Sequence, residues 1–386
     1  MCGIAGIFHK SNTGDCRNIK AMNDAISHRG PDGEGYIAVQ TGSGNIYQLA
    51  GEQTPVSAIP IEKFSENTDL HLAHRRLSII DLSPAGHQPM ANNRQDIWIT
   101  YNGEIYNYLS LKSELEGRGY TFSSHTDTEV LLYAYEEWGT DCLHRFNGMW
   151  SFVIYDKRRN ILFGSRDRFG VKPLYYVRDA GFFAFCSEIK GLMATGMVSR
   201  KANTNAAASY LKQGLENFAG DTFFDSVSEL LPAHSFVYDL KTFKFETSKY
   251  YNLKTNNIWE SYDEKKCGEH IAHVRDKVLN AVDLRLHADV AVGSCLSGGM
   301  DSSAIVCSIE QLLTNRQYDS VGKRQGVVTA CYDNFHLDES SWAKIVVDST
   351  GADWHKTYPL REELLSDLSD LVYSQDVPFG STSIYA

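Results

Sequence analysis

Short apolar runs separated by turn-forming residues dominate the first half of the chain. Runs of this length are typical of strands in antiparallel sheets. In some runs apolar and polar residues alternate, and in others the apolar residues are grouped. The expected strands cover residues 3–8, 69–74, 96–101, 149–155, 161–165, 175–177 and 182–187. Helices are expected at residues 18–26 and directly after Thr126. This order predicts an α+β fold with layered antiparallel sheets.

The pattern changes in the second half. Residues 201–256 are transitional, with an expected helix at 205–213 and a hairpin formed by 235–240 and 245–251. Beyond them, apolar residues recur at helical spacing, which predicts a helix over residues 267–286 whose apolar face packs on the core. The apolar positions of that helix are Ile271, Val274, Val278 and Val282.

Strands and helices then alternate along the chain. The expected strands are residues 290–296, 327–332 and 354–358, and the expected helices include 340–349 and 362–372. Repeated strand-helix-strand units predict an α/β doubly wound parallel sheet, whose ligands bind at the carboxyl ends of the strands. Two domains are therefore expected, at residues 2–200 and 201–386.

Composition narrows the class of protein. A chain of 386 residues exceeds what one hydrophobic core usually supports, which agrees with two domains. The formal net charge of -11 argues against a nucleic-acid surface, although a nucleotide needs only local positive groups. The 8 cysteines include no Cys-x-x-Cys pair, so neither a zinc site nor a disulfide framework is expected. With no apolar stretch of roughly 18 residues and no signal-peptide pattern, we expect a cytoplasmic protein without a membrane partner.

Two motifs in the first half have ordinary structural explanations. Asn102-Gly103 follows an expected strand, and this dipeptide is typical of a tight hairpin turn. Thr126 and Glu129 form a capping box, in which Asp127 would complement the helix dipole in the first turn. The local pattern therefore predicts a hairpin turn and a helix start at these positions.

Cys2 becomes a candidate nucleophile if the initiator methionine is removed, which its small side chain permits. The residue would then carry a thiol, with an ordinary pKa of about 8.5, and an α-amine, with an ordinary pKa of about 7.7–8.0. The amine can take the thiol proton near neutral pH without a histidine. A cysteine at the second position is more often just a small residue, so the other motifs decide between the two roles.

A glycine-rich turn follows the expected strand at residues 290–296. Its sequence is Ser297-Gly298-Gly299-Met300-Asp301-Ser302-Ser303. A strand, a glycine-rich turn and a helix in this order direct backbone N–H groups and a helix N-terminus toward phosphate. The turn matches neither the Walker A pattern nor G-x-G-x-x-G. On local grounds a generic Gly-Gly turn is the alternative.

These motifs carry a resemblance when they are taken together. They occur in order as Cys2-Gly3-Ile4, His28-Arg29-Gly30-Pro31-Asp32, Arg76-Leu77-Ser78-Ile79, Tyr101-Asn102-Gly103-Glu104, Thr126-Asp127-Thr128-Glu129 and Arg166-Asp167-Arg168-Phe169-Gly170. The series resembles the glutaminase domain of class II, N-terminal-nucleophile glutamine amidotransferases over roughly residues 2–200. The later glycine-rich turn closely resembles the pyrophosphate loop of the ATP pyrophosphatases. The combination resembles the glutamine-hydrolysing asparagine synthetase family across the whole chain.

The resemblance implies a chemistry for the first domain. Cys2 would attack the side-chain amide of glutamine and release ammonia, and water would cleave the resulting glutamyl thioester. The Asn102 side chain and the Gly103 N–H would stabilise the tetrahedral oxyanion. Arg29 would support the loop over the nucleophile. The implied glutamine site is Arg76, Leu77, Ser78, Ile79, Ile80, Asn102, Gly103, Glu104 and Asp127.

Within that site, the charged residues take specific roles. Arg76 would bind the α-carboxylate of glutamine, because a guanidinium offers two parallel donors. Asp127, helped by Glu104, would bind the α-ammonium.

For the second domain, the resemblance implies ATP as a substrate with Mg²⁺. The implied ATP-binding residues are Leu296, Ser297, Gly298, Gly299, Asp301, Ser302 and Ala330. Asp301 is the expected Mg²⁺ ligand, since Mg²⁺ prefers hard oxygens and accompanies phosphate. The implied enzyme is a carbon–nitrogen ligase that adenylates the β-carboxylate of aspartate, after which ammonia displaces AMP to form asparagine. A homodimer is also implied.

Other functions stay open on the sequence alone. No residue identifies aspartate, so the acceptor could instead be a carboxylate of a sugar, a peptide or a natural product. The Ser-Gly-Gly-x-Asp-Ser pattern disfavours a sugar-phosphate or phosphoribosyl acceptor, and the presence of Cys2 disfavours a non-catalytic regulatory protein. The family's synthetase domain continues past the last residue here, so we expect this half to be incomplete. On that expectation, these residues alone would act only as a glutaminase, and the acceptor-binding residues would follow Ala386.

Overall fold

The computed structural model describes residues 1–11, 13–216, 218–255, 258–332 and 338–385. They form two compact units, Met1–Leu253 and Lys254–Ala386. This division differs from the boundary expected near residue 200. The reason is strand pairing, because residues 228–229, 234–239 and 245–249 of the expected transitional segment are strands in the sheets of the first unit.

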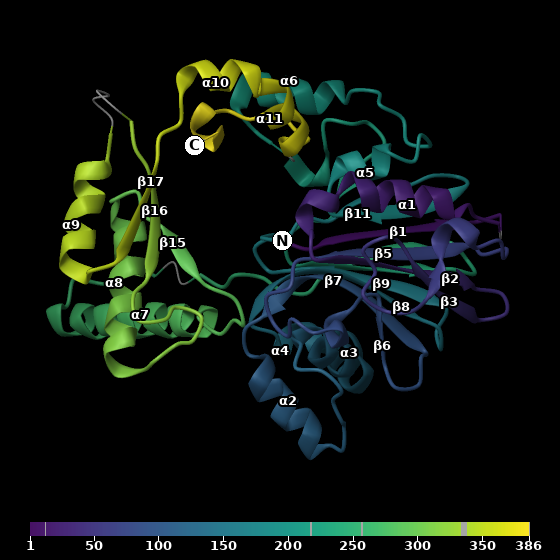
Figure 1. The fold of residues 1–386 in the computed structure, drawn as a ribbon, viewed down its shortest axis with the longest axis horizontal. Helices are drawn as coiled ribbons and strands as arrows, with labels where there is room; N and C mark the ends of the chain where they lie inside the picture. The colour runs from purple at the N-terminus through teal and green to yellow at the C-terminus, as the bar shows by residue number, and fades with distance from the viewer. Residues whose placement is uncertain (12, 217, 256–257, 333–337, 386) are drawn as a thin grey trace. The chain divides into compact units, whose positions relative to one another are not determined.

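Two stacked antiparallel sheets form the centre of the first unit (Figure 1). In spatial order, the first sheet contains β12 (Ser228–Glu229), β10 (Tyr175–Arg178), β11 (Phe182–Cys186), β1 (Gly3–His9), β5 (Leu70–Arg76), β2 (Gly33–Gln40), β3 (Asn45–Ala50) and β4 (Ile59–Pro60), the last pairing parallel to β3. The second contains β14 (Phe245–Lys249), β13 (His234–Asp239), β9 (Ile161–Arg166), β8 (Gly148–Asp156), β7 (Ile97–Ile105) and β6 (Met90–Ala91). The expected layered antiparallel sheets are therefore confirmed.

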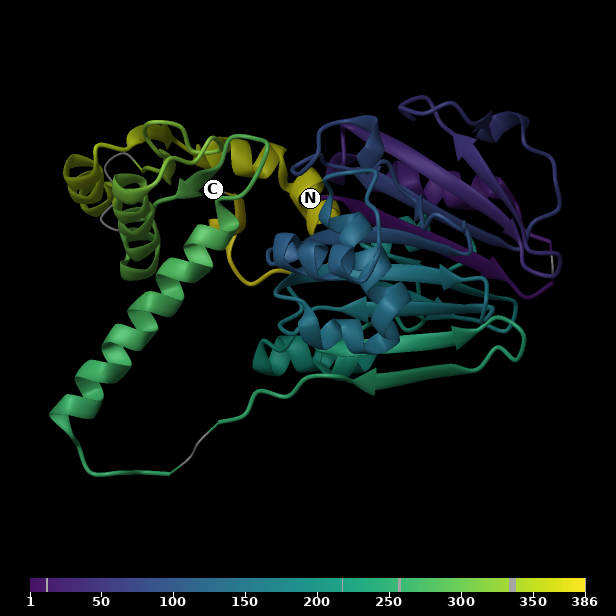
Figure 2. The same cartoon turned by 90° about the horizontal axis from the view of Figure 1, so that it is seen from below.

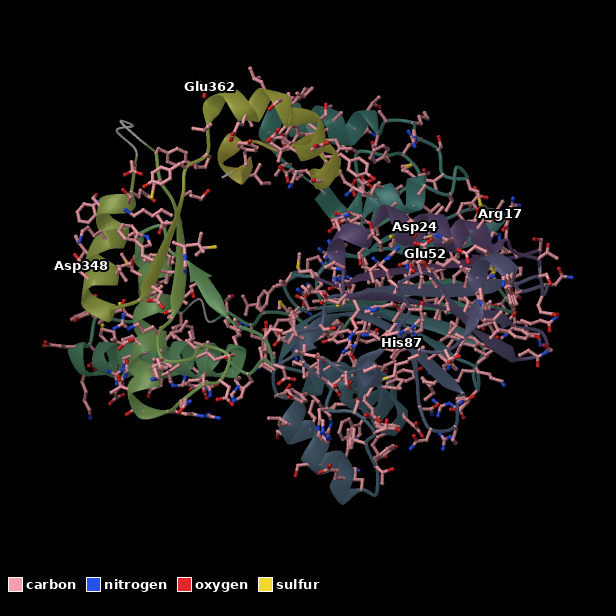
Figure 3. The ribbon with its side chains drawn as sticks, viewed as in Figure 1. Arg17, Asp24, Glu52, His87, Asp348 and Glu362 are labelled. Carbon is pink, nitrogen blue, oxygen red and sulfur yellow. The ribbon has the colours of Figure 1, made fainter. Side chains whose placement is uncertain are left out.

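Helices cover the outer faces of both sheets (Figure 1). The first sheet carries α1 (Cys16–Ala25) and α5 (Ile189–Met193), and the second carries α2 (Tyr108–Gly117), α3 (Asp127–Trp138) and α4 (Cys142–Arg145), while α6 (Thr204–Gln213) follows later in the chain. Charged side chains attach α1 to its sheet. Asp24 lies on this helix (Figure 3), and Arg75 of β5 donates to it through Nη2 at 2.7 Å.

Burial explains why β1 is apolar from Gly3 to Phe8. All of Gly3–His9 is buried, because α1 covers one face of the strand and the second sheet covers the other. Ile4 and Phe8 of β1 share a core cluster with Trp98 of β7 and Val153 of β8. Each such side chain contributes roughly 1.5–3 kcal/mol by leaving water. This core fixes the strand that begins directly after Cys2.

The expected hairpin turn at Asn102-Gly103 is wrong. Strand β7 continues through both residues, and its partner β8 pairs with it from Ile97 to Ile105. The long-range pairing overrides the local turn preference of the dipeptide. By contrast the expected N-cap is confirmed, since α3 begins at Asp127 and Thr126 Oγ1 accepts from Glu129 N at 3.2 Å. The reciprocal half of the box does not form, because the Glu129 carboxylate accepts from Ser124 N instead.

The second unit contains a parallel sheet, as expected. Its strands, in spatial order, are β15 (Gly293–Cys295), β16 (Gly326–Ala330) and β17 (Asp353–Thr357). Its helices are α7 (Glu264–Arg285), α8 (Met300–Asn315), α9 (Ser340–Thr350), α10 (Arg361–Ser366) and α11 (Leu368–Gln375). The helix expected over residues 362–372 is thus divided at Asp367. On α9, Asp348 (Figure 3) accepts from Lys344 one turn earlier.

The expected core-facing side of α7 is mostly wrong. This helix is the long green element in Figure 2. Val282 is buried and packs with Leu286 of the adjoining segment, but Ile271, Val274 and Val278 are exposed. The helical spacing predicts the helix correctly. Spacing alone does not show which turns of the helix pack against a neighbouring element. None of the described helices is long and apolar enough to cross a membrane.

Candidate active site

Cys2 lies immediately before β1, next to the residues that follow β5. Pairing of Gly3 with Arg75 brings these two chain segments together. The Sγ atom of Cys2 accepts from Leu77 N at 3.3 Å and donates to Leu77 O at 3.5 Å. Burial raises the pKa of the Cys2 thiol above its ordinary value, while the Leu77 N–H acts in the opposite direction. The thiol therefore depends on its surroundings to ionise near neutral pH.

The backbone of Cys2 is held by a buried ion pair. Arg29 donates through Nε to the Cys2 carbonyl at 2.9 Å and through Nη1 to Glu188 Oε1 at 2.7 Å. Glu188 also pairs with Lys190 and with His28, whose Nε2 lies 3.0 Å from Oε2. The sequence predicted only a supporting role for Arg29. In the structure that support is a hydrogen bond to the nucleophile's own residue.

Asn102 provides a donor with no partner. The residue is 1% exposed, and within the described part of the chain its Nδ2 makes no hydrogen bond. A buried donor left unpaired costs about 1–3 kcal/mol, so it is rare in a folded protein. An orphaned amide in a pocket is what a site for a negatively charged oxygen requires.

Strand periodicity directs the Gly103 N–H toward the same pocket. In β7, Tyr101 N donates to Gln88 Oε1 at 2.7 Å and Ile105 N donates to Asp127 Oδ2 at 2.9 Å, so both point away from β8. Alternate residues of a strand share a direction, which gives the Gly103 N–H the same orientation. A Cβ atom at Gly103 would collide with the carbonyl of Met149, so glycine is needed for this close approach.

Arg76 ends β5 with its guanidinium held by the following loop. Its Nη1 donates to Ser83 O at 2.7 Å, and its Nη2 donates to Asp81 O. Burial lowers the pKa of Arg76, but a guanidinium stays charged at neutral pH. The charge is thereby fixed in position before any anion binds.

Asp127 occupies the first turn of α3, which Thr126 caps. Its Oδ2 accepts from Tyr101 OH at 2.8 Å and from Ile105 N at 2.9 Å. Burial raises the pKa of Asp127, so a cationic partner would favour its ionised form. The expected anionic group is thus present, and its rotamer is fixed by β7.

One cavity contains Cys2, Arg76, Asn102, Gly103 and Asp127, but Arg29 does not line it. It is lined by Met1, Cys2, Arg76, Leu77, Ser78, Ile79, Ile80, Gly86, Gln88, Tyr101, Asn102, Gly103, Glu104, Thr126, Asp127, Thr128, Met149 and Lys172. Every residue of the glutamine site implied by the sequence therefore lines a single pocket with Cys2. The sequence motifs assigned no role to Gln88, Tyr101, Met149 and Lys172. Tyr101 belongs to one of those motifs and Lys172 follows the motif that ends at Gly170, whereas Gln88 and Met149 belong to none.

The glycine-rich turn of the second unit joins β15 to α8 as expected. Gly298 has φ +87, and a Cβ there would lie 2.5 Å from Ala343 N, so no other residue fits. Gly299 caps α8, and its N–H donates to Ser297 Oγ at 3.2 Å. Ser297 Oγ and Ser302 Oγ are 3.1 Å apart. The turn presents small polar residues at a helix N-terminus, which suits phosphate.

Leu296 and Ala330 lie at the same edge of the parallel sheet. Leu296 N donates to Val328 O at 2.8 Å, and Thr329 Oγ1 donates to Leu296 O at 2.7 Å. Ala330 ends β16, which is parallel to β15. The structure therefore brings the two expected adenine-side residues together at the carboxyl ends of the strands.

Asp301 is exposed in the first turn of α8. No three His, Cys, Asp or Glu side chains gather closely enough to hold a metal ion anywhere in the described residues. Mg²⁺ commonly uses one or two carboxylates together with substrate phosphates, so a single carboxylate fits an ion that arrives with a nucleotide. An ion there would also offset the repulsion between Asp301 and a phosphate at the same helix end.

Family models match most of the chain. A glutamine amidotransferase domain matches residues 61–251, and an asparagine synthase domain matches residues 273–386. The first match covers the residues of the pocket from Arg76 to Lys172, and the second covers the glycine-rich turn at residues 297–303.

Individual relatives extend the comparison over nearly the whole chain. A Methanocaldococcus jannaschii protein named as a glutamine-hydrolysing asparagine synthetase is 35% identical over 99% of this chain. A Bacillus subtilis glutamine-hydrolysing asparagine synthetase is 30% identical over 98%, and a Gibberella zeae amidase is 29% identical over 98%. The chain spans 70%, 57% and 54% of the lengths of these three relatives. Among solved structures, a B. subtilis glutamine phosphoribosylpyrophosphate amidotransferase aligns with 100% of this chain and 70% of its own, at 14% identity and a TM-score of 0.48.

Proposed function

The chain belongs to the glutamine-hydrolysing asparagine synthetase family, and from this premise we propose that its first unit hydrolyses glutamine with Cys2 as the nucleophile. One observation carries the proposal. The orphaned Asn102 Nδ2 donor lies in the same pocket as the Cys2 thiol, where an oxyanion would receive its hydrogen bond. The fixed Arg76 guanidinium and the Asp127 carboxylate supply the two charges that a free amino acid needs.

The reaction begins once Met1 has been removed. The α-amine of Cys2 takes the proton from Sγ, and the thiolate forms a bond to the side-chain amide carbon of glutamine. The electron pair of the carbonyl moves to oxygen, where Asn102 Nδ2 and the Gly103 N–H donate to it. When the carbonyl re-forms, the C–N bond breaks and the leaving nitrogen takes the proton from the α-ammonium, which gives ammonia and a glutamyl thioester.

Water completes the cycle. Its oxygen attacks the thioester carbon and its proton goes to the α-amine, so a second oxyanion forms in the same place. The C–S bond then breaks, the sulfur recovers a proton from the α-ammonium, and glutamate leaves. Throughout, Arg76 binds the α-carboxylate and Asp127, helped by Glu104, binds the α-ammonium of the substrate.

The second unit is the proposed destination of the ammonia. The Ser297–Ser303 turn and the N-terminus of α8 suit the pyrophosphate of ATP, and Asp301 would hold its Mg²⁺. Leu296 and Ala330 would lie near the adenine end. We propose aspartate as the acceptor, because the relatives with 30% identity or more over nearly the whole chain are named as asparagine synthetases. Activation as an adenylate would make AMP the leaving group.

A different carboxylate acceptor is the second candidate. It is favoured by the amidases of Gibberella zeae and Penicillium rubens, which are 29% and 28% identical over 98% of the chain. Incubating the protein with ATP, glutamine and a panel of carboxylic acids distinguishes the two by the amide that forms. Asparagine formation supports aspartate, and an amide of another acid with none from aspartate contradicts it.

Glutamate production from glutamine tests the first step directly. Cys2→Ala is expected to abolish it, because no other group in the pocket can form the thioester. Cys16→Ala is the matched control, since Cys16 begins α1 and does not line the pocket. Retention of activity by Cys2→Ala would overturn the nucleophile assignment, as would equal loss in both variants.

A further inference from the structure

Lys172 is a buried cation that the proposed mechanism does not use. The residue is 5% exposed and lines the pocket with Cys2. Across the described residues, its Nζ makes no hydrogen bond and no ion pair within 4 Å. Lys190 is nearly as buried, at 8%, but pairs with Glu188. An unpaired ammonium in such a place lowers stability, so it points to a role in function.

The loop that carries Lys172 is fixed from several directions. Its backbone N–H donates to Asp167 Oδ2 at 3.0 Å, and its carbonyl accepts from Arg166 Nε at 2.8 Å. Asp167 Oδ1 accepts from the N–H groups of Phe169 and Val171, each at 3.0 Å. The Arg166–Gly170 motif therefore acts as a support that keeps the lysine at the pocket.

The charges around the nucleophile explain what this cation can do. Those facing Cys2 and Lys172 are Arg29, Asp32, Arg76, Glu104, Asp127 and Asp167. Burial raises the pKa of the Cys2 thiol, and Asp127 adds to this, whereas Lys172 opposes it. Burial lowers the pKa of the N-terminal amine of Met1, and Arg29 and Lys172 lower it further.

The other two cations near Cys2 already have partners. Arg29 is paired with Glu188, and Arg76 is held by loop carbonyls where the substrate carboxylate is proposed to bind. Lys172 carries a charge that no described carboxylate neutralises by direct contact. A cation at this position stabilises a thiolate and disfavours a second positive charge on the neighbouring amine.

We propose that Lys172 is a positioning residue of the glutaminase site, whose ammonium stabilises the ionised Sγ of Cys2 and keeps the α-amine of Cys2 unprotonated between steps. This inference rests on the proposed glutamine hydrolysis and assigns a role that the oxyanion donors do not fill. The amine acts as a base only while it is free, and the sulfur attacks only as a thiolate. Both conditions hold at lower pH when a positive charge lies close by.

The pH dependence of glutamine hydrolysis tests the proposal. Lys172→Met keeps the length and the apolar part of the side chain but removes the charge. The acidic limb of kcat/KM should move to higher pH by at least about one unit, the shift expected from one charge within about 12 Å at an effective dielectric constant of about 20. Near pH 7 this corresponds to roughly tenfold lower kcat/KM, with recovery toward wild-type rates at higher pH.

Two further variants separate charge from structure. Lys172→Gln should shift the limb in the same direction, and Lys172→Arg should restore the wild-type limb. Denaturant unfolding should give Lys172→Met the same stability as wild type or more, because an unpaired charge has been removed. The role of Lys172 is overturned if the acidic limb of kcat/KM is unshifted in both Lys172→Met and Lys172→Gln. Glutamine hydrolysis itself still stands in that case, provided that wild type is active and Cys2→Ala is inactive. If wild type fails to hydrolyse glutamine, the proposed function itself is overturned.

Discussion

The pocket around Cys2 and the glycine-rich turn at residues 297–303 hold their polar groups in different ways. In the pocket, Asn102, Asp127 and Arg76 are 1%, 6% and 8% exposed. Asp127 is held by groups of β7, and Arg76 is held by carbonyls of the loop that follows it. In the loop, Ser297 and Asp301 are exposed, and the hydrogen bonds of Ser297 stay within the loop.

The hydrophobic cores next to the two sites also differ, and the core of the first unit is the more extensive. The first unit has extensive core clusters between its sheets and under α3, whereas the described clusters of the second unit are small, as around Leu296 and Val327. A buried site positions its donors when the protein folds, so they need not reorganise during the reaction. An exposed loop relies more on the charge of its ligand to order it. We therefore expect the pocket to respond to changes of geometry and the loop to respond to changes of charge.

Acid is expected to have the largest effect, and on the first unit. Burial lowers the pKa of His71 and of His74 to about 3, whereas in the unfolded chain it is about 6.5. Their contribution to stability is fully present above about pH 6.5 and is lost as the pH falls toward 3, by on the order of 5 kcal/mol for each. The described histidines of the second unit are exposed or half-buried.

Urea unfolding of the whole chain at a series of pH values measures this effect. The transition of the first unit should lose stability steeply below pH 6.5, and that of the second unit should change less. His71→Gln should reduce the slope for the first unit. If the free energy of unfolding fell equally with pH in both units, the contrast between buried and exposed sites would be contradicted.

Asn102→Ala should have the next largest effect. Loss of an oxyanion donor lowers kcat by about 10²–10³ with little change in KM. Because the amide has no partner in the folded chain, unfolding stability should stay the same or rise. Steady-state kinetics and denaturant unfolding check both parts. An equal loss of activity and stability would mean that Asn102 is only structural.

Arg76→Lys should raise KM for glutamine by roughly 10–100-fold, the cost of losing one charge-assisted hydrogen bond. A lysine keeps the charge but cannot offer two parallel donors to a carboxylate. Arg94→Lys is the matched control, because Arg94 is an exposed residue of the same unit with surface ion pairs. An unchanged KM in Arg76→Lys would remove Arg76 from the proposed substrate site.

Asp301→Asn should have the smallest of these effects. We expect the affinity for ATP with Mg²⁺ to fall by about fivefold, since one carboxylate ligand is lost while the phosphate oxygens remain. Without Mg²⁺ the variant should bind ATP at least as well as wild type, because repulsion at the α8 N-terminus is reduced. Calorimetry measures both affinities. Glutamine hydrolysis should be unaffected, because Asp301 does not line the Cys2 pocket, and a loss of it would contradict the assignment of Asp301 to the ATP site alone.

Local chemistry explains which parts of the fold the sequence predicted. The start of α3 was predictable because Thr126 and Glu129 interact within one turn. The extended form of Asn102-Gly103 was not, because it depends on β8, far along the chain. The exposed face of α7 was also missed, since helical spacing does not reveal what lies opposite.

In the candidate site, too, local motifs were predictable from the sequence and long-range contacts were not. Motif residues such as Arg76 and Asp127 could be named in advance, and they do line one pocket. Lys172 could not, because its importance lies in being buried without a counter-ion, and neither burial nor the absence of a partner can be read from sequence. The orphaned Nδ2 of Asn102 is likewise visible only in three dimensions.

Intact mass spectrometry of the protein, acid-quenched during glutamine turnover, tests the central claim most directly. We predict a chain that begins at Cys2 and carries one glutamyl group, which hydroxylamine removes and which Cys2→Ala does not form. A chain that keeps Met1 and still converts glutamine to glutamate, with no glutamyl adduct at any time, would contradict the N-terminal nucleophile.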